Sequence, residues 1–259
     1  MFNFINIILL LIVLLCIKYL FFYTNNIDNF QIITNPNINI QFQQEFYDKS
    51  IFPELDLINN SIIKKELIQY IHTINNWTEW PEHELWKNNN TNLNSNSNSN
   101  TNSNISWTII PLIAFGKLCE KNAKLFPNTL NQLKKIPNLI TAGFSKLGPG
   151  TKLSYHKGWA KLSNNVLRCH LGLIVPENKC MIMVTRNNNY SNLSNIKAMY
   201  QQENKWIIFD DSLYHSASNN SESYRIVLIL DIKRPTNIMT GTSNIEYSEE
   251  LDNFMNEFI

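Results

Sequence analysis

The feature that most constrains the fold is a series of short β-like runs in the second half of the chain. After Pro137, each run either alternates apolar with polar residues or is continuously apolar, and turn signals separate the runs. No stretch with helical spacing lies between them, which is typical of a β-sandwich or barrel. The predicted strands are residues 139–147, 150–156, 166–175, 180–186, 206–209 and 224–232.

Helical patterns precede these strands. Apolar residues recur at helical spacing over residues 51–75 and again over 109–136, with a break at Pro127. The sequence therefore predicts a mainly β domain with flanking helices over residues 51–240. Residues 241–259 are expected to form a C-terminal tail.

A low-complexity stretch interrupts this domain. Residues 88–104 are almost wholly Asn, Ser and Thr, which cannot bury enough apolar surface to offset the entropy of ordering them. We expect a disordered insertion here. The alternative is a linker between two domains, although the residues before it make a poor domain on their own.

The N-terminal segment has the composition of a membrane anchor. Residues 4–23 are apolar with Lys18 as the only charge, and about 20 such residues can span a bilayer. We expect an anchor over residues 1–25 and a polar stem over residues 26–50. A cleaved signal peptide is the alternative, but no Ala-x-Ala-like site follows. The prediction is a single-pass protein with a lumenal (type II) domain, although neither flank carries enough Lys or Arg to fix the orientation.

Charge and cysteine usage exclude some classes of function. The formal net charge is +1, so the chain lacks the basic footprint of a nucleic-acid-binding protein. The four cysteines show no paired spacing that would indicate a disulfide framework or a zinc knuckle.

Two polar side chains share one face of the predicted strand 166–175. Arg168 and His170 alternate with Leu167, Cys169 and Leu171, so both point away from the apolar face. Burying a cation and an imidazole without partners is unfavourable, and an anionic ligand would supply one. The alternative is an edge strand whose polar face meets water.

Three of the five histidines lie at or near strand ends. His156, His170 and His215 all fall in the β-rich half, whereas His72 and His83 fit surface or structural positions. Two imidazoles with open coordination positions suit Fe(II) or Zn(II). A chance pairing is the alternative.

A further cation lies inside an apolar strand. Arg225 begins a run of apolar residues, and a carboxylate best matches its planar guanidinium. That carboxylate could belong to a ligand. It could also come from an internal salt bridge to Asp210, Asp211 or Asp231.

An ordered series of short motifs resembles the catalytic domain of the aspartyl/asparaginyl β-hydroxylase family of Fe(II)- and 2-oxoglutarate-dependent oxygenases. The series covers residues 144–235 and consists of Ser145 with Pro149-Gly150-Thr151, His156-Lys157-Gly158, Arg168-x-His170-Leu171-Gly172-Leu173, Phe209-Asp210-Asp211-Ser212-x-x-His215 and Tyr224-Arg225. The resemblance implies a double-stranded β-helix (jelly-roll or cupin-like) oxygenase core preceded by the N-terminal transmembrane helix.

The resemblance also implies roles for individual residues. His156 and His215 match the metal-binding histidines. Ser145, Arg168, His170 and Arg225 match residues that hold 2-oxoglutarate. Gly158 stands where most enzymes of the wider class have an acidic third ligand, and the family shares this glycine. Asp210 and Asp211 are expected in the turn or as orienting partners of a metal-bound histidine.

The expected function is Fe(II)- and 2-oxoglutarate-dependent hydroxylation of the β-carbon of Asp or Asn in a protein substrate. A lipid acyl chain is the alternative substrate, because a lipid-modifying branch resembles this domain. Lys152 and Trp159 depart from the family pattern near the mouth of the site, which leaves substrate choice open. Two different functions compete with hydroxylation: a binding protein that keeps the fold without activity, and a zinc hydrolase. The hydrolase would need a general base and a third ligand that the spacing does not offer.

Overall fold

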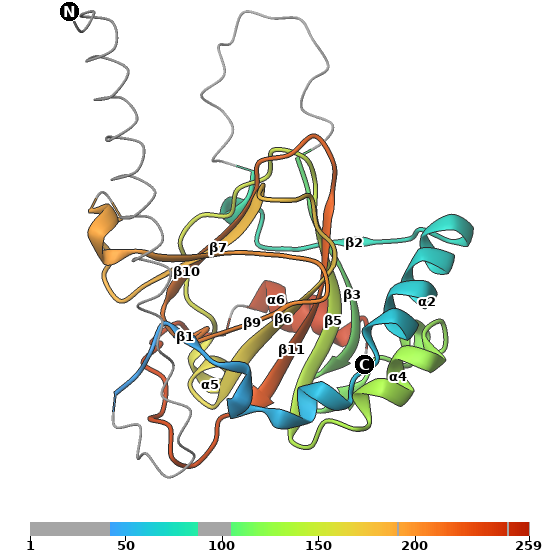
Figure 1. Cartoon of the computed structure of the whole chain (residues 1–259), viewed down its shortest axis with the longest axis horizontal. Coiled ribbons are helices and arrows are strands. Elements are labelled where there is room, and N and C mark those ends of the chain that lie inside the picture. The colour runs from blue at the N-terminus through green and yellow to red at the C-terminus, as the bar shows by residue number, and fades with distance from the viewer. Residues whose placement is uncertain (1–41, 88–104, 191, 248, 259) are drawn as a thin grey trace, which may run out of the picture. The chain divides into compact units, whose positions relative to one another are not determined.

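Two antiparallel β-sheets form the centre of the described structure. The computed structural model describes residues 42–87, 105–190, 192–247 and 249–258. The larger sheet has the strand order β1-β9-β6-β11-β5-β3-β2, with β4 beside β3 (Figure 1). Its strands are β1 (Phe46–Tyr47), β2 (Thr78–Glu79), β3 (Trp107–Ala114), β4 (Lys117–Leu118), β5 (Leu139–Leu147), β6 (Val166–Ile174), β9 (Trp206–Phe209) and β11 (Arg225–Lys233).

The smaller sheet has the order β10-β7-β8 and packs against one face of the larger sheet. Its strands are β7 (Cys180–Thr185), β8 (Lys197–Tyr200) and β10 (Tyr214–Asn219). The helices are α2 (Asn60–Thr73), α3 (Glu120–Ala123), α4 (Pro127–Leu133), α5 (Ala160–Ser163) and α6 (Glu249–Asn256). Short 3-10 helices span Lys49–Ile51, Pro53–Leu57, His83–Leu85 and Leu193–Asn195.

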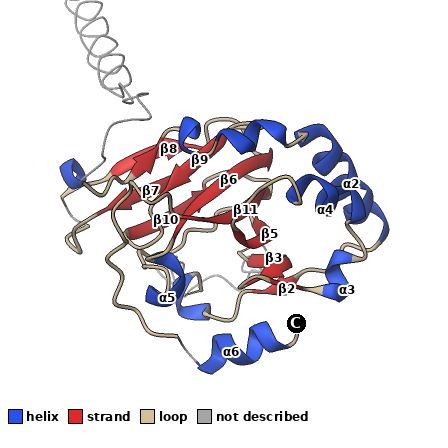
Figure 2. Ribbon diagram, turned by 90° about the horizontal axis from the view of Figure 1, so that it is seen from below, coloured by secondary structure: helices blue, strands red, loops and turns tan. Residues whose placement is uncertain are grey.

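Alternation along β11 separates two layers of the interior. Ile226, Leu228 and Leu230 point to the outer face, where they pack in one core with side chains of α2 and α4. Figure 2 shows these two helices beside the larger sheet. Arg225 and Asp231 belong to the other face, which looks toward the smaller sheet. There, Leu147, Ile207 and Phe209 of the large sheet share a second core with Ile182, Val184 and Ala217. The polar residues of the predicted site therefore lie between two apolar layers.

The helical layer is fixed by capping interactions. The Asn59 side chain accepts hydrogen bonds from the backbone N–H groups of Ser61 and Ile62 and so starts α2. Glu66 on α2 accepts hydrogen bonds from the N–H groups of Asn128 and Thr129, in the first turn of α4. This carboxylate holds the two helices together against the outer face of the sheet.

The fold agrees with the predicted class, which was mainly β with flanking helices. Strands β5 and β9 begin and end at the predicted residues, β6 and β7 end one residue earlier than predicted, and β11 is shifted by one residue at both ends. The prediction of a helix over 109–136 is wrong in its first part, because residues 107–114 form β3. Ile109, Ile110 and Ile113 are β-branched and favour a strand, and Pro111 lies at a register shift where the missing N–H is tolerated.

Further departures concern segments that the sequence left as loop or tail. Residues 150–156, predicted as a strand, make only isolated bridges at Lys152 and His156. Strand β8 lies between the predicted strands 180–186 and 206–209, where the sequence predicts no strand. The folded unit extends beyond the predicted limits at both ends, because β1 precedes residue 51 and α6 follows residue 240.

The predicted anchor and insertion, residues 4–23 and 88–104, lie outside the described residues. Of the helices that the structure does describe, none has the length and apolar character needed to cross a bilayer.

Candidate functional site

Two histidines from different segments meet at the edge of the smaller sheet. His156 follows the β5 turn and His215 lies in β10, and their backbones exchange two hydrogen bonds of 3.0 Å and 2.8 Å. This bridge places the two imidazole centroids 4.3 Å apart. The structure therefore brings together the two residues that the sequence assigned to a metal.

Backbone carbonyls set the tautomer of both imidazoles. His156 Nδ1 lies 2.8 Å from the carbonyl oxygen of Ser154, and His215 Nδ1 lies 3.0 Å from that of Leu213. A carbonyl can only accept, so each Nδ1 carries the hydrogen and each Nε2 keeps its lone pair. Burial lowers the pKa of His156 to about 3 and that of His215 to about 4, so both rings are neutral near pH 7. Neutral imidazoles with free Nε2 atoms are the form that binds a transition metal.

Asp211 fills the space beside this pair. Its Oδ1 lies 3.3 Å from His215 Nε2 and 2.5 Å from Arg168 Nη1. A Cβ atom on Gly158 would stand 1.8 Å from Asp211 Oδ2, so no side chain fits at residue 158 while this carboxylate is in place. The glycine at the position of the usual acidic ligand therefore has a steric reason in this fold.

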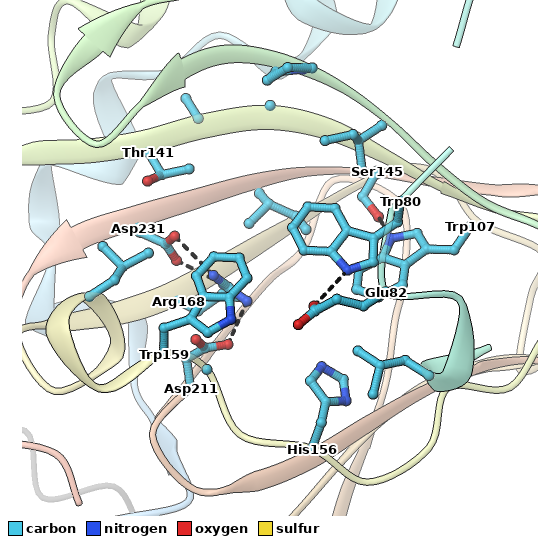
Figure 3. Close-up of a pocket in the computed structure, with 18 of the residues that line it drawn as sticks. Trp80, Glu82, Trp107, Thr141, Ser145, His156, Trp159, Arg168, Asp211 and Asp231 are labelled. Atoms are coloured by element: carbon cyan, nitrogen blue, oxygen red, sulfur yellow. Dashed lines mark hydrogen bonds and ion pairs between the residues drawn. The ribbon is translucent and has the colours of Figure 1, made fainter. Parts of the chain in front are cut away.

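Arg168 is held by carboxylates of the protein itself. Its Nε and Nη2 donate to the two oxygens of Asp231 at 2.8 Å and 3.0 Å, and it also pairs with Asp211 (Figure 3). Burial alone would lower the pKa of Arg168, but the two carboxylates outweigh burial and raise it. The alternative of an edge strand is wrong, because β6 lies between β9 and β11. The role of Arg168 toward 2-oxoglutarate stays a prediction.

Arg225, in contrast to Arg168, has no carboxylate partner among the described residues. Its side chain is 1% exposed, and within the described residues its Nε and Nη1 have no hydrogen-bond partner. Burial lowers the pKa of Arg225 to about 10. The carboxylates proposed as internal partners are engaged elsewhere: Asp210 with Arg234, and Asp211 and Asp231 with Arg168. A buried guanidinium with free donors is a site for an anion.

His170 presents a second donor on the same face. Its Nδ1 lies 3.3 Å from Gln201 Nε2, which donates to it, so the hydrogen resides on Nε2. That Nε2 is buried and has no partner among the described residues. Ser145, also predicted here, accepts a hydrogen bond of 3.1 Å from Trp107 Nε1. His170 and Arg225 together fit the carboxylate of a 2-oxoglutarate molecule.

The donor set fits Fe(II) with an anionic co-substrate. Within the described ranges, no three His, Cys, Asp or Glu side chains are arranged as a metal cluster, so a metal here would rest on the two imidazoles. The remaining positions would be open to a bidentate co-substrate and water. Asp210 and Asp211 lie in the turn between β9 and β10, as expected, but neither carboxylate contacts a histidine Nδ1. Backbone carbonyls do so, and Asp210 binds Arg234, Gln43 and Ser212.

A pocket of about 380 Å³ opens beside His156. His156, Arg168 and Asp211 line its polar end, and aromatic residues including Trp80, Trp107 and Trp159 line the rest (Figure 3). The Trp80 ring stacks on Trp107 with centroids 4.8 Å apart and on Trp159 with centroids 5.9 Å apart. The sequence showed these tryptophans only as scattered residues, with no periodic signal that would join them.

Comparison with known proteins confirms the resemblance. The family described as Aspartyl/Asparaginyl beta-hydroxylase matches residues 59–235. An ornithine lipid ester-linked acyl 2-hydroxylase of Rhizobium tropici is 40% identical over 129 residues, which are 50% of this chain and 42% of the relative. The aspartyl/asparaginyl beta-hydroxylase of Homo sapiens is 30% identical over 136 residues, 50% of this chain and 16% of the relative. These matches thus span less than half the length of either relative.

Among solved structures, a Pseudomonas putida prolyl-4-hydroxylase aligns with a TM-score of 0.40 and 10% identity, covering 69% of this chain and 89% of that one. The family match covers most of the chain and contains every residue assigned to the site, from Ser145 to Arg225. The chain belongs to the aspartyl/asparaginyl β-hydroxylase family.

Proposed function

We propose that the protein is an Fe(II)- and 2-oxoglutarate-dependent hydroxylase. The observation that carries this proposal is the contrast between two pairs of side chains, one at the edge of the smaller sheet and one on the inner face of the larger sheet. Among the described residues, His156 and His215 offer Nε2 atoms that carry no hydrogen, while His170 and Arg225 offer unpaired N–H donors. The first pair suits a cation and the second suits an anion, as this chemistry requires.

Each residue has a defined part in the reaction. When bound, Fe(II) would activate O2, and 2-oxoglutarate would supply two electrons by its conversion to succinate and CO2 while one oxygen atom enters a substrate C–H bond. His156 and His215 would hold the metal. Arg225 and His170 would bind and orient the co-substrate carboxylate. Arg168 fixes Asp211 beside His215, and the aromatic walls exclude water from the reacting centre.

We propose a lipid acyl chain as the substrate. Two observations support it: the higher identity to a relative named for acyl hydroxylation, and the apolar lining of the pocket beside His156. Hydroxylation of Asp or Asn in a protein is the second candidate, and the human relative favours it. We also propose that residues 4–23 anchor the protein in a membrane with a lumenal domain. Protease protection in sealed vesicles would test this topology.

The test uses the full chain in detergent with Fe(II), 2-oxoglutarate and O2. Succinate should form with the wild type and not with His215→Ala. Mass spectrometry should find a gain of one oxygen on the acyl chains of added lipids. A gain on an Asp-containing peptide would support the second candidate. Equal succinate from both proteins would refute the hydroxylase and favour a binding protein.

A further inference from the structure

The C-terminal segment, defined here as residues 243–247 and 249–258, folds back onto the domain beside the pocket. Ile245 pairs with Trp159 in a parallel bridge, and the Ala160 N–H donates to the Ile245 carbonyl at 2.8 Å. The backbone of Ser243 makes hydrogen bonds of 2.7 Å and 3.0 Å to the side chain of Asn164. These contacts fasten the segment to the loop that follows His156.

Aromatic side chains continue this attachment outward. The Tyr247 ring lies 5.2 Å from Trp159 and 5.4 Å from Phe115, and the Phe254 ring on α6 lies 5.8 Å from Trp80. Phe254 is 8% exposed, so α6 is seated on the domain through this ring. Ile245 itself lines the pocket. The segment therefore forms part of the apolar wall, and it lies beyond residue 235, where the family match ends.

The charges around the pocket select for an uncharged occupant. Of the described residues that line it, the cations are Arg168 and Lys157. Arg168 is already paired with Asp211 and Asp231, and the Lys157 ammonium lies 4.7 Å from the Tyr214 ring and 3.4 Å from the Thr242 carbonyl. An aspartate side chain would bring a further carboxylate beside Asp211 and Asp231, and the counter-charge that the described lining offers it is the half-buried Lys157. An aliphatic chain meets no such penalty.

We propose that this pocket binds an aliphatic acyl chain and that Ile245, held in place by the contacts of the C-terminal segment, forms the outer wall that selects it. The inference rests on the proposed hydroxylase function, and it assigns recognition to a segment outside the matched region. A volume of about 380 Å³ lies within the range of small-ligand sites. The chain would run from the polar end, at His156, along the tryptophan rings toward Ile245. Each added methylene should tighten binding about fourfold until the pocket is filled.

Tryptophan fluorescence offers a direct readout that needs no turnover. Three of the six tryptophans, Trp80, Trp107 and Trp159, line the pocket. The probe is a monoacylglycerol with a dibromostearoyl chain, whose bromine atoms quench nearby indoles, added to the metal-free full chain. We expect saturable quenching, with affinity that rises with chain length among unbrominated competitors.

The decisive variant is Ile245→Asp, which places a carboxylate on the wall. Ile245 is 41% exposed, so the change is compatible with folding, and Ile62 on α2 is a matched control at 38% exposure. Ile245→Asp should lower the affinity for the probe about tenfold or more. Ile62→Asp and Ile245→Leu should bind as the wild type does, with equal melting temperatures in all four proteins.

Unsaturable quenching, or equal affinity in Ile245→Asp and wild type, would overturn the inference. So would displacement of the probe by an Asp-containing peptide at lower concentration than by monoacylglycerol. The outcome is separable from the hydroxylase assignment. Ile245-dependent binding without succinate formation would refute the proposed function alone, and succinate formation without saturable probe binding would refute this inference alone.

Discussion

The polar face between the sheets and the aromatic wall beside it differ in their origin along the chain. The ionisable groups of the first lie on or next to β5, β6, β10 and β11, inside the region shared with the family. Part of the second comes from residues 243–258, beyond that region. Most of the ionisable groups thus lie on paired strands, whereas part of the aromatic wall lies beyond the region matched to the family.

The polar face and the aromatic wall also differ in the number of ionisable groups that they bury. The polar face buries several ionisable groups close to one another, and among the described residues it leaves donors of Arg225 and His170 without partners. The aromatic wall is built of stacked rings. Unsatisfied buried groups of this kind are explained by a ligand that would satisfy them. Changes in the two regions should therefore have separable effects.

The largest expected effect comes from removing a metal ligand. His215→Ala should lower the rate of succinate formation by more than about 100-fold, because loss even of groups that only support metal ligands costs 10- to 100-fold. His72→Ala on the exposed face of α2 is the control and should keep the wild-type rate. A His215→Ala protein that retains a tenth of the activity would contradict the two-histidine site.

Removing the unpaired guanidinium should affect the co-substrate alone. Arg225→Ala should raise the KM for 2-oxoglutarate about 30-fold or more, since truncating one partner of a buried charged pair costs at least about 2 kcal/mol. Arg186→Ala is the control, because that side chain is 47% exposed and pairs with Glu45. An unchanged KM in steady-state assays would remove Arg225 from the co-substrate site.

The lowered pKa values of His156 and His215 predict an acid-labile metal-free protein. His156 and His215 have pKa values of about 3 and 4 in the folded state, whereas an unfolded histidine titrates near 6.5. Below pH 6.5 the unfolded state binds more protons, so stability is lost as pH falls toward 4, by at most about 1.4 kcal/mol per pH unit for each imidazole. The free energy of unfolding, measured by denaturant melts between pH 7 and 5, should change less with pH in His156→Gln than in wild type. An equal pH dependence in the two proteins would mean that the fold does not hold His156 in its neutral form.

The smallest effect concerns the space between Gly158 and Asp211. Gly158→Ala should lower the free energy of unfolding by about 1–3 kcal/mol, because the new methyl group overlaps the Asp211 carboxylate. Combining Gly158→Ala with Asp211→Gly should relieve that overlap. The double variant should therefore lose less unfolding free energy than the sum of the losses in the two single variants. Additive losses in urea melts would show that the two residues do not compete for space.

The sequence predicts long strands well, as in β5 and β6, and in β6 one face is apolar throughout. It fails at β3, where a run of isoleucines mimics a buried helix, and at residues 241–259, where Ile245, Tyr247 and Phe254 follow no regular period. Periodicity reports the local backbone, and these residues gain their meaning only from contacts with Trp80 and Trp159, far away in the chain.

The candidate site also depends on long-range contacts that the sequence pattern does not report. Residue types and order along the chain identified the histidines and Arg225, because a charged group in an apolar strand needs a partner. They could not show which cation is already paired. Arg168 and Arg225 look alike in sequence, yet only Arg168 meets Asp231, 63 residues away. Long-range register between β6 and β11 makes that difference.

One measurement tests the division of roles most directly. Anaerobic equilibrium dialysis of the full chain with Fe(II) and 2-oxoglutarate compares wild type, His215→Ala and Arg225→Ala. The opposite tautomers predict that wild type binds both, that His215→Ala loses Fe(II), and that Arg225→Ala keeps Fe(II) but loses 2-oxoglutarate. Retention of Fe(II) by His215→Ala, or of 2-oxoglutarate by Arg225→Ala, would contradict this division.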